Sequence, residues 1–548
     1  MPSNSSKSKE YSPLARPRAG AVSSRAGDIA GLTPTASGFS AKEYENGITN
    51  PDLSHTSITN TSPAELSPKP AVRCENETLV SAEPVVVKTH IAEDADDQGR
   101  YQTQRATRPT QSEKDKAKLA RDNWLVRNGH SITYFGLYLF SVLVLFRPYE
   151  IVPGMEFLSA TAFYFALATL LIYLPSQFAA EGNFTILSTE VKAVLALAAI
   201  ALVTVPIAKD PKTAWDTFND PFIKAVLMFV VMVNVVRTRK RLMAMIWLSL
   251  GIGIYLGITA LDLYASGKFA VEEYRVAVDV GGLFGNPNDM ALHFVMMTPL
   301  ALTLAIGTAS KPLKIAYFAL TVLFVGANMV TFSRGGFLGF FASAAVLAWK
   351  LGRKQRTKVT IGALIGGAAF IVAAPGNYGL RMLSIFIPGL DAVGSSDQRK
   401  ELLQRSLLVT ARNPWGIGIG NFPIVGIHEH QTHNAYTQVS SELGVLGLIA
   451  YLFFVISPIR RLRAIERMLF DKDDLNWYYY LSIGLQASIV GYMVSSFFAS
   501  VAYNWFIYYG IAYAVAFRRI FDLYSRENAA ELTSDTADRS SFVPAEAA

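Results

Sequence analysis

Residues 220–264 read DPFIKAVLMFVVMVNVVRTRKRLMAMIWLSLGIGIYLGITALDLY, and they carry the pattern from which the class of fold follows. Two apolar runs, 220–236 and 241–264, flank the basic turn Arg237-Thr238-Arg239-Lys240-Arg241. Each run is close to the roughly 20 apolar residues that a helix needs to cross a bilayer. The stretch therefore predicts a helical hairpin that crosses a membrane twice, with its basic turn on one side.

The same pattern recurs along most of the 548-residue chain, which is 51% hydrophobic. It predicts an all-α polytopic membrane protein with about 12 transmembrane helices. The expected spans are roughly 131–147, 156–175, 190–207, 220–236, 241–264, 287–307, 312–331, 335–351, 358–374, 436–457, 476–497 and 500–518. The last two lie close together, so eleven spans is the alternative.

The basic residues between the spans predict the orientation. Clusters occur at 237–241, at 350–358, at 460–467 and at Arg518-Arg519, and all four fall on one side if the spans alternate. The positive-inside rule makes that side cytoplasmic, together with both termini. Two sizeable loops, about 265–286 and about 375–435, then lie on the outer face. The basic residues that give the formal net charge of +7 are therefore explained by the orientation of the protein in the membrane, and we expect no nucleic acid partner.

Three regions follow from this pattern. Residues 1–125 are rich in Ser, Thr, Pro and charge, and we expect a disordered cytoplasmic head, with an organelle transit peptide as the alternative for its basic start. Residues 126–525 form the multi-span domain, and residues 526–548 are expected to be a disordered cytoplasmic tail. The single cysteine, Cys74, excludes an intramolecular disulfide and a cysteine-based metal site.

Three short polar sequences stand on the expected outer side. The first is Arg275 with Gly281-Gly282-Leu283-Phe284-Gly285-Asn286-Pro287-Asn288-Asp289, and the second is Thr331-Phe332-Ser333-Arg334-Gly335-Gly336. The third is Arg412-Asn413-Pro414-Trp415-Gly416-Ile417-Gly418-Ile419-Gly420-Asn421-Phe422, continuing to Thr432-His433-Asn434-Ala435-Tyr436 and Glu442-Leu443-Gly444.

In order, spacing and topology, these sequences resemble the O-antigen ligase and O-antigen polymerase superfamily of bacterial envelope enzymes, over most of residues 220–460. The 125-residue head is not part of that pattern. The resemblance implies a GT-C-like, metal-independent glycosyltransferase of the bacterial inner membrane that needs no cofactor. It implies an undecaprenyl-diphosphate-linked saccharide as donor, and a hydroxyl of a saccharide, lipid A core or protein as acceptor, at the periplasmic face. Polysaccharide assembly proteins are the protein partners that it implies.

The resemblance also implies roles for individual residues. His433 matches the loop histidine that assists the acceptor hydroxyl. Arg275 and Arg399 match the loop arginines that hold the diphosphate, Arg275 better than Arg399, and Arg334 matches the arginine of the Ser-Arg-Gly-Gly turn.

The residue types support the same chemistry. A lipid diphosphate is a negatively charged leaving group, and the planar, permanently charged arginine side chain matches phosphate oxygens. An acceptor hydroxyl is a poor nucleophile at neutral pH, and histidine is the base whose ordinary pKa lies near neutrality. Direct attack by that hydroxyl would invert the anomeric carbon. The expected outer loops hold no Asp-x-Asp, so we predict no metal site.

Each of these residues also has a structural alternative. His433 could be a hydrogen-bonding surface residue, with His428 and His430 as rivals for its role. Arg275 could pair with Glu272 or Glu273, and Arg334 could snorkel from a short turn to the membrane surface.

Further candidates lie in and beside the large loop. Arg399 could pair with Asp397 or Glu401 on a helix that runs toward Arg412. Glu442 stands at the start of a span, where a carboxylate is costly unless paired, so we expect it to orient His433 or an arginine. Three residues are weaker candidates, with salt bridges to loop acids as the default: Arg381, Arg405 and Arg412. Three glycines are read as a tight loop rather than a phosphate nest: Gly416, Gly418 and Gly420.

Two other classes of function compete with a glycosyltransferase. A flippase for a lipid-linked saccharide would need charged residues along a path through the bilayer, but the spans carry few, chiefly Lys224 and Asp262. A non-catalytic membrane scaffold would leave the outer histidine and arginines without a role. The sequence does not distinguish a ligase from a polymerase, because both act on the same kind of donor.

Overall fold

The computed structural model describes residues 124–541, apart from 159–160, 271, 273, 279, 281–283, 388 and 390–394. The expected head lies almost wholly outside these residues. Within them, every regular element is a helix, with short 3₁₀ or π turns between some. The main helices are α2 (Trp124–Ser141), α4 (Thr161–Glu181), α5 (Thr189–Thr204), α6 (Pro211–Thr217), α7 (Ile223–Val235), α8 (Arg239–Ala265), α9 (Pro287–Gly307), α10 (Lys311–Val330), α11 (Arg334–Ala373), α12 (Tyr378–Leu383), α13 (Ser395–Arg412), α14 (Phe422–Val425), α15 (Ala435–Met468), α16 (Asn476–Ser495) and α17 (Trp505–Ser541).

Nine helices in the described part are long and apolar enough to cross a membrane. This confirms an all-helical membrane protein, while the count of twelve spans stays a prediction. The difference arises at three places. Helix α5 has only 16 residues, α17 has only 13 residues before its first charged residues Arg518-Arg519, and the two spans predicted at 335–351 and 358–374 are joined in α11.

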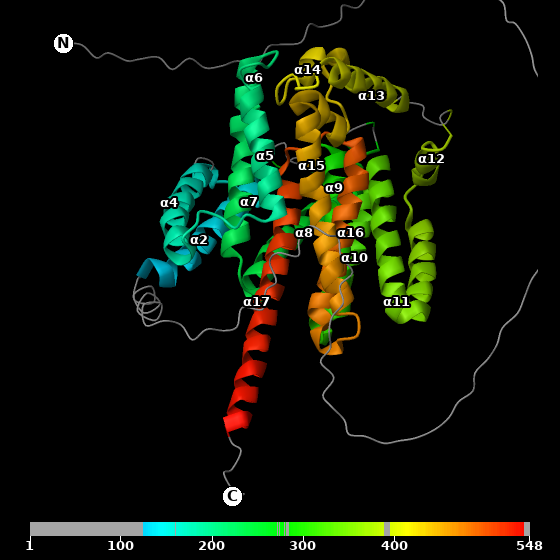
Figure 1. Ribbon diagram of the computed structural model, residues 1–548. Helices are drawn as coiled ribbons and strands as arrows, with labels where there is room; N and C mark the ends of the chain where they lie inside the picture. Colours follow the sequence, from blue (N-terminus) through cyan, green and yellow to red (C-terminus); the bar gives the residue numbers. More distant parts are fainter. Residues whose placement is uncertain are drawn as a thin grey trace, which may run out of the picture. The chain divides into compact units, whose positions relative to one another are not determined.

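Helix α11 is a hairpin rather than a straight rod. Its backbone leaves helical geometry at Gln355, with φ of −137° and ψ of 55°. The rings of Phe340 and Phe370 stack with their centroids 6.1 Å apart, whereas thirty residues of straight helix would separate them by about 45 Å. Figure 1 shows the two limbs side by side at the edge of the bundle. Each limb corresponds to one predicted span.

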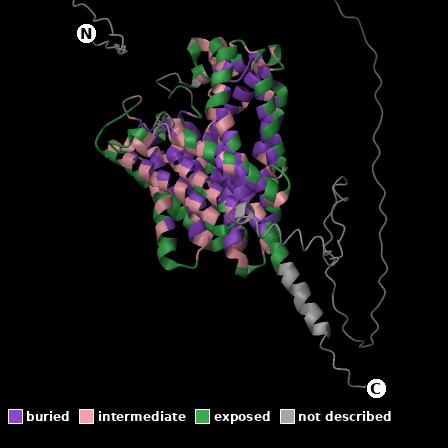
Figure 2. Ribbon diagram, turned by 90° about the vertical axis from the view of Figure 1, so that its left-hand side faces the viewer, coloured by how far each residue is buried: buried purple, intermediate pink, exposed green. Residues whose placement is uncertain are grey.

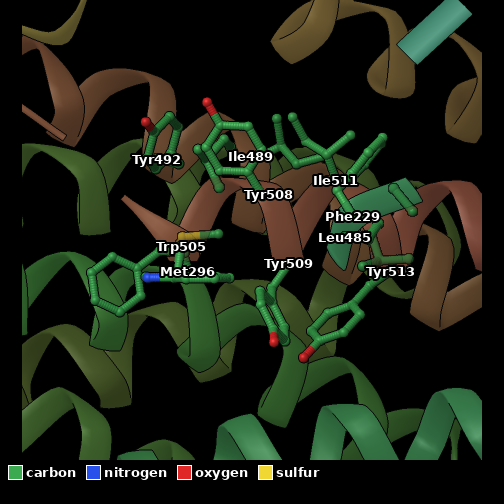
Figure 3. Close-up of a cluster of buried hydrophobic side chains, with 14 of the residues drawn as sticks. Phe229, Met296, Leu485, Ile489, Tyr492, Trp505, Tyr508, Tyr509, Ile511 and Tyr513 are labelled. Atoms are coloured by element: carbon green, nitrogen blue, oxygen red, sulfur yellow. The ribbon is translucent and has the colours of Figure 1, made fainter. Parts of the chain in front are cut away.

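The core is organised around α17, which is buried on all sides from Trp505 to Phe517. Figure 3 shows its tyrosines among side chains of α7, α9 and α16. Their hydroxyls bond to neighbouring helices: Tyr509 lies 2.7 Å from Ser141 Oγ and Tyr513 lies 2.7 Å from Ser249 Oγ. Interhelical hydrogen bonds of this kind stabilise packing where lipid offers no hydrophobic drive between helices.

Helix α17 also continues to Ser541, into the part of the tail that the sequence predicted to be disordered. Residues 526–532 read RENAAEL, which are mostly strong helix formers, and no Gly or Pro ends the helix before residue 541. Local propensity therefore extends the helix beyond the apolar run.

The two ends of the bundle differ. The short helices α12, α13 and α14 gather at one end, and the α7–α8 turn, the bend of α11 and the α15–α16 turn lie at the other (Figure 1). The second end carries the basic clusters at 237–241, 350–358 and 460–467. Buried residues fill the interior between the ends, and exposed ones line both ends and the outside (Figure 2).

Candidate functional site

Arg334 begins α11 directly after a tight turn. Ser333 caps the helix, because its Oγ accepts a hydrogen bond of 3.1 Å from the backbone nitrogen of Gly336. The Arg334 side chain is buried, and its Nη1 donates to Ser384 Oγ at 3.2 Å. Arg334 is therefore held in place and does not snorkel to the surface.

The two glycines after Arg334 let this turn pack closely. A Cβ atom on Gly335 would lie 2.8 Å from Phe498 Cβ, in the turn that ends α16, and one on Gly336 would lie 2.7 Å from Ala291 Cβ in α9. Any side chain at either position would push α11 away from its neighbours. The Ser-Arg-Gly-Gly sequence thus places Arg334 against the wall formed by α9 and the end of α16.

Arg275 lies behind this turn and braces it. Its Nε donates to Thr331 O and its Nη2 donates to Asn288 Oδ1, both at 3.0 Å. Asn288 Oδ1 also accepts from Ser333 Oγ at 2.8 Å. Arg275 is only 5% exposed, and its Nη1 lies 3.6 Å from Glu272. The pairing with Glu272 that the sequence offered as an alternative is therefore present.

Glu272 holds a second arginine from the large loop. Arg381 Nη1 lies 2.8 Å from Glu272 Oε2, and Arg381 Nε donates to Phe332 O at 3.0 Å. Both arginines thus clamp the turn that precedes Arg334, from opposite loops. The default expected for Arg381, a salt bridge to a loop acid, is confirmed.

Arg399 stands on α13, where the sequence predicted a helix running toward Arg412. Helix α13 spans Ser395–Arg412 and confirms that prediction. The neighbouring Asp397 pairs with Lys400 at 3.2 Å. Arg399 is half-buried and faces the interior of the loop, among residues of α11 and of the segment before α15.

His433 lies between a buried threonine and the residue that caps α15. Asn434 Oδ1 accepts from the backbone nitrogens of Tyr436 and Thr437 at 2.9 and 3.1 Å, and Thr432 Oγ1 lies 3.0 Å from Ser500 Oγ. His433 itself adopts a left-handed φ of 49°, which is unfavourable for a residue with a Cβ. Its neighbours hold it there, and such strain is typical of functional positions.

Three of the predicted site residues meet around one cavity of about 230 Å³. His433, Arg334 and Arg399 all line it, together with Lys400. Its remaining walls are Leu338, Ile385, Leu403, Thr432, Asn434, Phe497 and Phe498. None of these described lining residues is acidic, so the cavity is suited to an anion.

The electrostatics of the cavity keep His433 neutral. Burial, the nearby Arg399 and His430 lower the pKa of His433 to about 4. Burial and the charge of Arg381 also lower the pKa of Arg275, to about 10, although Glu272 acts in the opposite direction. Arg275 therefore remains charged at neutral pH, and the imidazole of His433 has a free lone pair.

Glu442 does not lie on this cavity. It is fully buried in the first part of α15, and its Oε1 accepts from the backbone nitrogen of Phe422 at 3.2 Å. The carboxylate faces the glycine-rich loop rather than His433. Its predicted role in orienting the site remains a prediction, and its observed contact is with the loop backbone.

The glycine-rich loop packs against the segment between α5 and α7. Gly418 has a φ of 97°, and a Cβ there would lie 2.2 Å from Ala208 Cβ. Asn421 Oδ1 accepts from the Asp210 backbone nitrogen at 2.6 Å, and Ile417 O accepts from that of Lys209 at 2.9 Å. These contacts agree with the prediction of a tight loop.

Sequence reasoning missed several residues around the site. Asn288 lies in the first turn of α9, and its Oδ1 joins Arg275 to Ser333. Lys400 lines the cavity next to Arg399, and only adjacency to Arg399 pointed to it. Phe497 and Phe498 lie in the 3₁₀ turn that ends α16, more than sixty residues after His433, and no local signal marks them.

The arrangement is that of an all-helical membrane protein with a basic cavity and a neutral histidine at one end of the bundle. Residues 319–452 match the family model described as O-antigen ligase. This match confirms, over that segment, the resemblance to the O-antigen ligase and polymerase superfamily. The matched segment contains Arg334, Arg399, His433 and Glu442, and Arg275 precedes it. No curated protein matches the chain.

Proposed function

We propose that the protein is a metal-independent glycosyltransferase of the bacterial inner membrane. It transfers a saccharide from an undecaprenyl-diphosphate-linked donor to an acceptor hydroxyl at the periplasmic face. The observation that carries this proposal is the meeting of His433, Arg334 and Arg399 around one cavity. The basic turns at the opposite end of the bundle support the periplasmic placement of that cavity.

The arginines supply the binding of the donor. Arg334 and Arg399 approach the cavity from different helices, so that a diphosphate between them meets a guanidinium on two sides. Charge grows on the diphosphate as its bond to the sugar breaks, and fixed positive groups stabilise that charge best in a site with little water. Arg275 acts on Arg334 through the preceding turn and is a positioning residue.

His433 supplies the base. The acceptor oxygen attacks the anomeric carbon, the bond from that carbon to the diphosphate oxygen breaks, and its electron pair leaves with the diphosphate. The acceptor proton passes to the free lone pair of the imidazole. A bound diphosphate offsets the repulsion by Arg399, so donor binding raises the pKa of His433 from about 4 and strengthens the base.

Reconstituted protein tests the proposal. The donor is an undecaprenyl-diphosphate-linked oligosaccharide, and the acceptor is either lipid A core or a second donor molecule. We expect His433→Gln to slow transfer by about 10²–10⁴-fold. His430 is exposed, and its ring centroid lies 6.4 Å from that of His433, so the control variant His430→Gln should retain activity. Normal transfer by His433→Gln would refute the mechanism.

The product separates the remaining possibilities. Longer lipid-linked chains identify a polymerase, and saccharide joined to lipid A core identifies a ligase. Movement of the donor across the vesicle membrane, without formation of a new glycosidic bond, would instead support the alternative that the protein is a flippase.

A further inference from the structure

The part of the large loop that follows α11 exposes an apolar face. Four of its large side chains are between 49% and 72% exposed: Leu380, Leu383, Phe386 and Ile387. Single exposed apolar residues are common on proteins, but several together mark a contact with another apolar surface. We call residues 378–387, which comprise α12 and the turn after it, the α12 segment.

The exposed face of the α12 segment carries no charge. The one charged residue of the segment is Arg381, and its side chain is only 12% exposed. The guanidinium turns inward, where it pairs with Glu272 and donates to Phe332 O at 3.0 Å. A loop in water gains nothing when it hides its only cation and exposes four apolar side chains, whereas a loop against lipid does.

Aromatic contacts fix the α12 segment to both limbs of α11, at the end opposite the bend. Tyr378 is buried, and its ring centroid lies 6.2 Å from that of Phe337 in the first limb and 5.9 Å from that of Phe370 in the second. Pro375 and Gly376, the latter with a φ of 41°, turn the chain just after the second limb. Figure 1 shows α12 next to this end of α11.

The apolar face of the α12 segment continues that of the second limb. Ile371 and Val372, in the last turn of this limb, are 75% and 87% exposed. Because α11 is among the helices that are long and apolar enough to cross a membrane, these side chains face lipid. No charged residue lies between Val372 and Leu380. One uncharged apolar surface therefore runs from the membrane helix onto the α12 segment.

The inner face of the α12 segment belongs to the basic cavity. Ile385 lines this cavity, and Ser384 Oγ accepts from Arg334 Nη1 and donates to Arg381 O at 2.6 Å. Phe386, the most exposed of the four apolar residues, follows Ile385 directly. The segment thus forms a thin wall between the cavity and the apolar surface outside it.

We propose that the α12 segment is inserted in the bilayer, with its exposed apolar side chains among the lipids of the outer leaflet. Amphipathic segments bury their apolar face about 5–10 Å deep, at the boundary of head groups and acyl chains. The segment lies at the end of the bundle opposite the basic turns, which is the outer end by the positive-inside rule. A second copy of the chain is the rival occupant, but lipid is favoured because the face continues that of a membrane helix. The proposal does not depend on glycosyl transfer.

Fluorescence quenching tests the proposal on the full-length protein in lipid vesicles. Cys74 is replaced by serine, so that each variant carries one new cysteine labelled with bimane. The test variant is Phe386→Cys, and Ile387→Cys provides a second position on the same face. The quenchers are lipids brominated near the head group, lipids brominated deep in the acyl chain, and iodide in the water.

Two further variants calibrate the quenching. Leu364→Cys lies on the exposed side of the second limb, midway between the bend and Ala373, and should be quenched most by the deep bromines. Glu401→Cys replaces an exposed charged residue of α13 and should be quenched by iodide alone. We expect the labels at Phe386 and Ile387 to lose fluorescence mainly to the shallow bromines, because insertion is about 5–10 Å deep, and to be shielded from iodide.

Two outcomes would overturn the proposal. Quenching at both test positions by iodide, as at Glu401, would place the segment in water. Protection from all three quenchers would show that protein covers the face, either a second copy or another part of the chain. Because both side chains are exposed, the labels should leave the melting temperature unchanged, and either position suffices if the other variant fails to fold.

Discussion

Replacing Arg275 with lysine separates a positioning role from direct substrate binding. The guanidinium donates two hydrogen bonds of 3.0 Å, to Thr331 O and Asn288 Oδ1, and approaches Glu272. A lysine keeps the charge, but its single nitrogen cannot reproduce this planar fork. Since Thr331 is fully buried, an acceptor left without its donor there is not rescued by water.

The size of the effect follows from these bonds. Each hydrogen bond from a charged group contributes roughly 1.5–3 kcal/mol. Arg275→Lys should therefore lower the free energy of unfolding by about 1.5–3 kcal/mol if one bond is lost and by about 3–6 kcal/mol if both are lost. Transfer should fall as well, because the loosened turn carries Arg334.

Two measurements on purified protein decide the matter: unfolding in detergent, and the KM for the lipid-linked donor. Arg412→Lys is the matched control, because that arginine is exposed at the end of α13. We expect Arg275→Lys to lose stability and activity together and Arg412→Lys to lose neither. A raised KM with unchanged stability would contradict the positioning role and would make Arg275 a direct ligand of the diphosphate, as the family resemblance implies.

Three further predictions concern the backbone and the charge of the site. His433→Gly should raise the free energy of unfolding by about 1 kcal/mol in denaturation experiments, since the φ of 49° suits glycine, while transfer is lost. Gly418→Ala should lower the free energy of unfolding, because the new Cβ would lie 2.2 Å from Ala208 Cβ. Gly352→Ala is the control: its Cβ would have no neighbour within 4 Å, and in thermal unfolding it should raise the free energy of unfolding by about 0.5–1 kcal/mol, because alanine favours the helix more than glycine does. Burial and Arg399 lower the pKa of His433 from 6.5 to about 4, so the unfolded chain takes up a proton in this interval that the folded chain does not. Stability present above pH 6.5 should thus fall by at most about 3 kcal/mol toward pH 4, and the His433→Gly variant should lack this slope in unfolding measured against pH.

The membrane domain and much of the site were predictable from local sequence. The apolar runs on both sides of Arg237–Arg241 became α7 and α8, and the helix expected to run toward Arg412 became α13. The motif around His433 pointed to the residue that does line the basic cavity. The bend at Gln355 lies in the basic turn that the sequence predicted between two spans.

Other features depended on contacts between distant segments. Arg275 was expected to bind the diphosphate, which stays a prediction, and only the structure shows that its side chain lies behind the turn that carries Arg334. Glu442 was expected to orient His433 or an arginine, which stays a prediction, and the contact that the structure shows is a hydrogen bond that its carboxyl group accepts from the backbone nitrogen of Phe422. Phe498 forms a wall of the cavity although it belongs to the end of α16.

From the amino-acid sequence it follows that the chain is a bundle of long apolar helices, because a backbone in lipid must satisfy its hydrogen bonds within each segment, so that composition and length indicate this class of fold. Only the tertiary structure decided which arginines face the cavity, which one supports it from behind, and that the α12 segment turns its apolar side chains outward beside the cavity. The physical reason is that helix packing in a bilayer depends on close side-chain fit and on polar contacts between segments far apart in the chain, which no local pattern records.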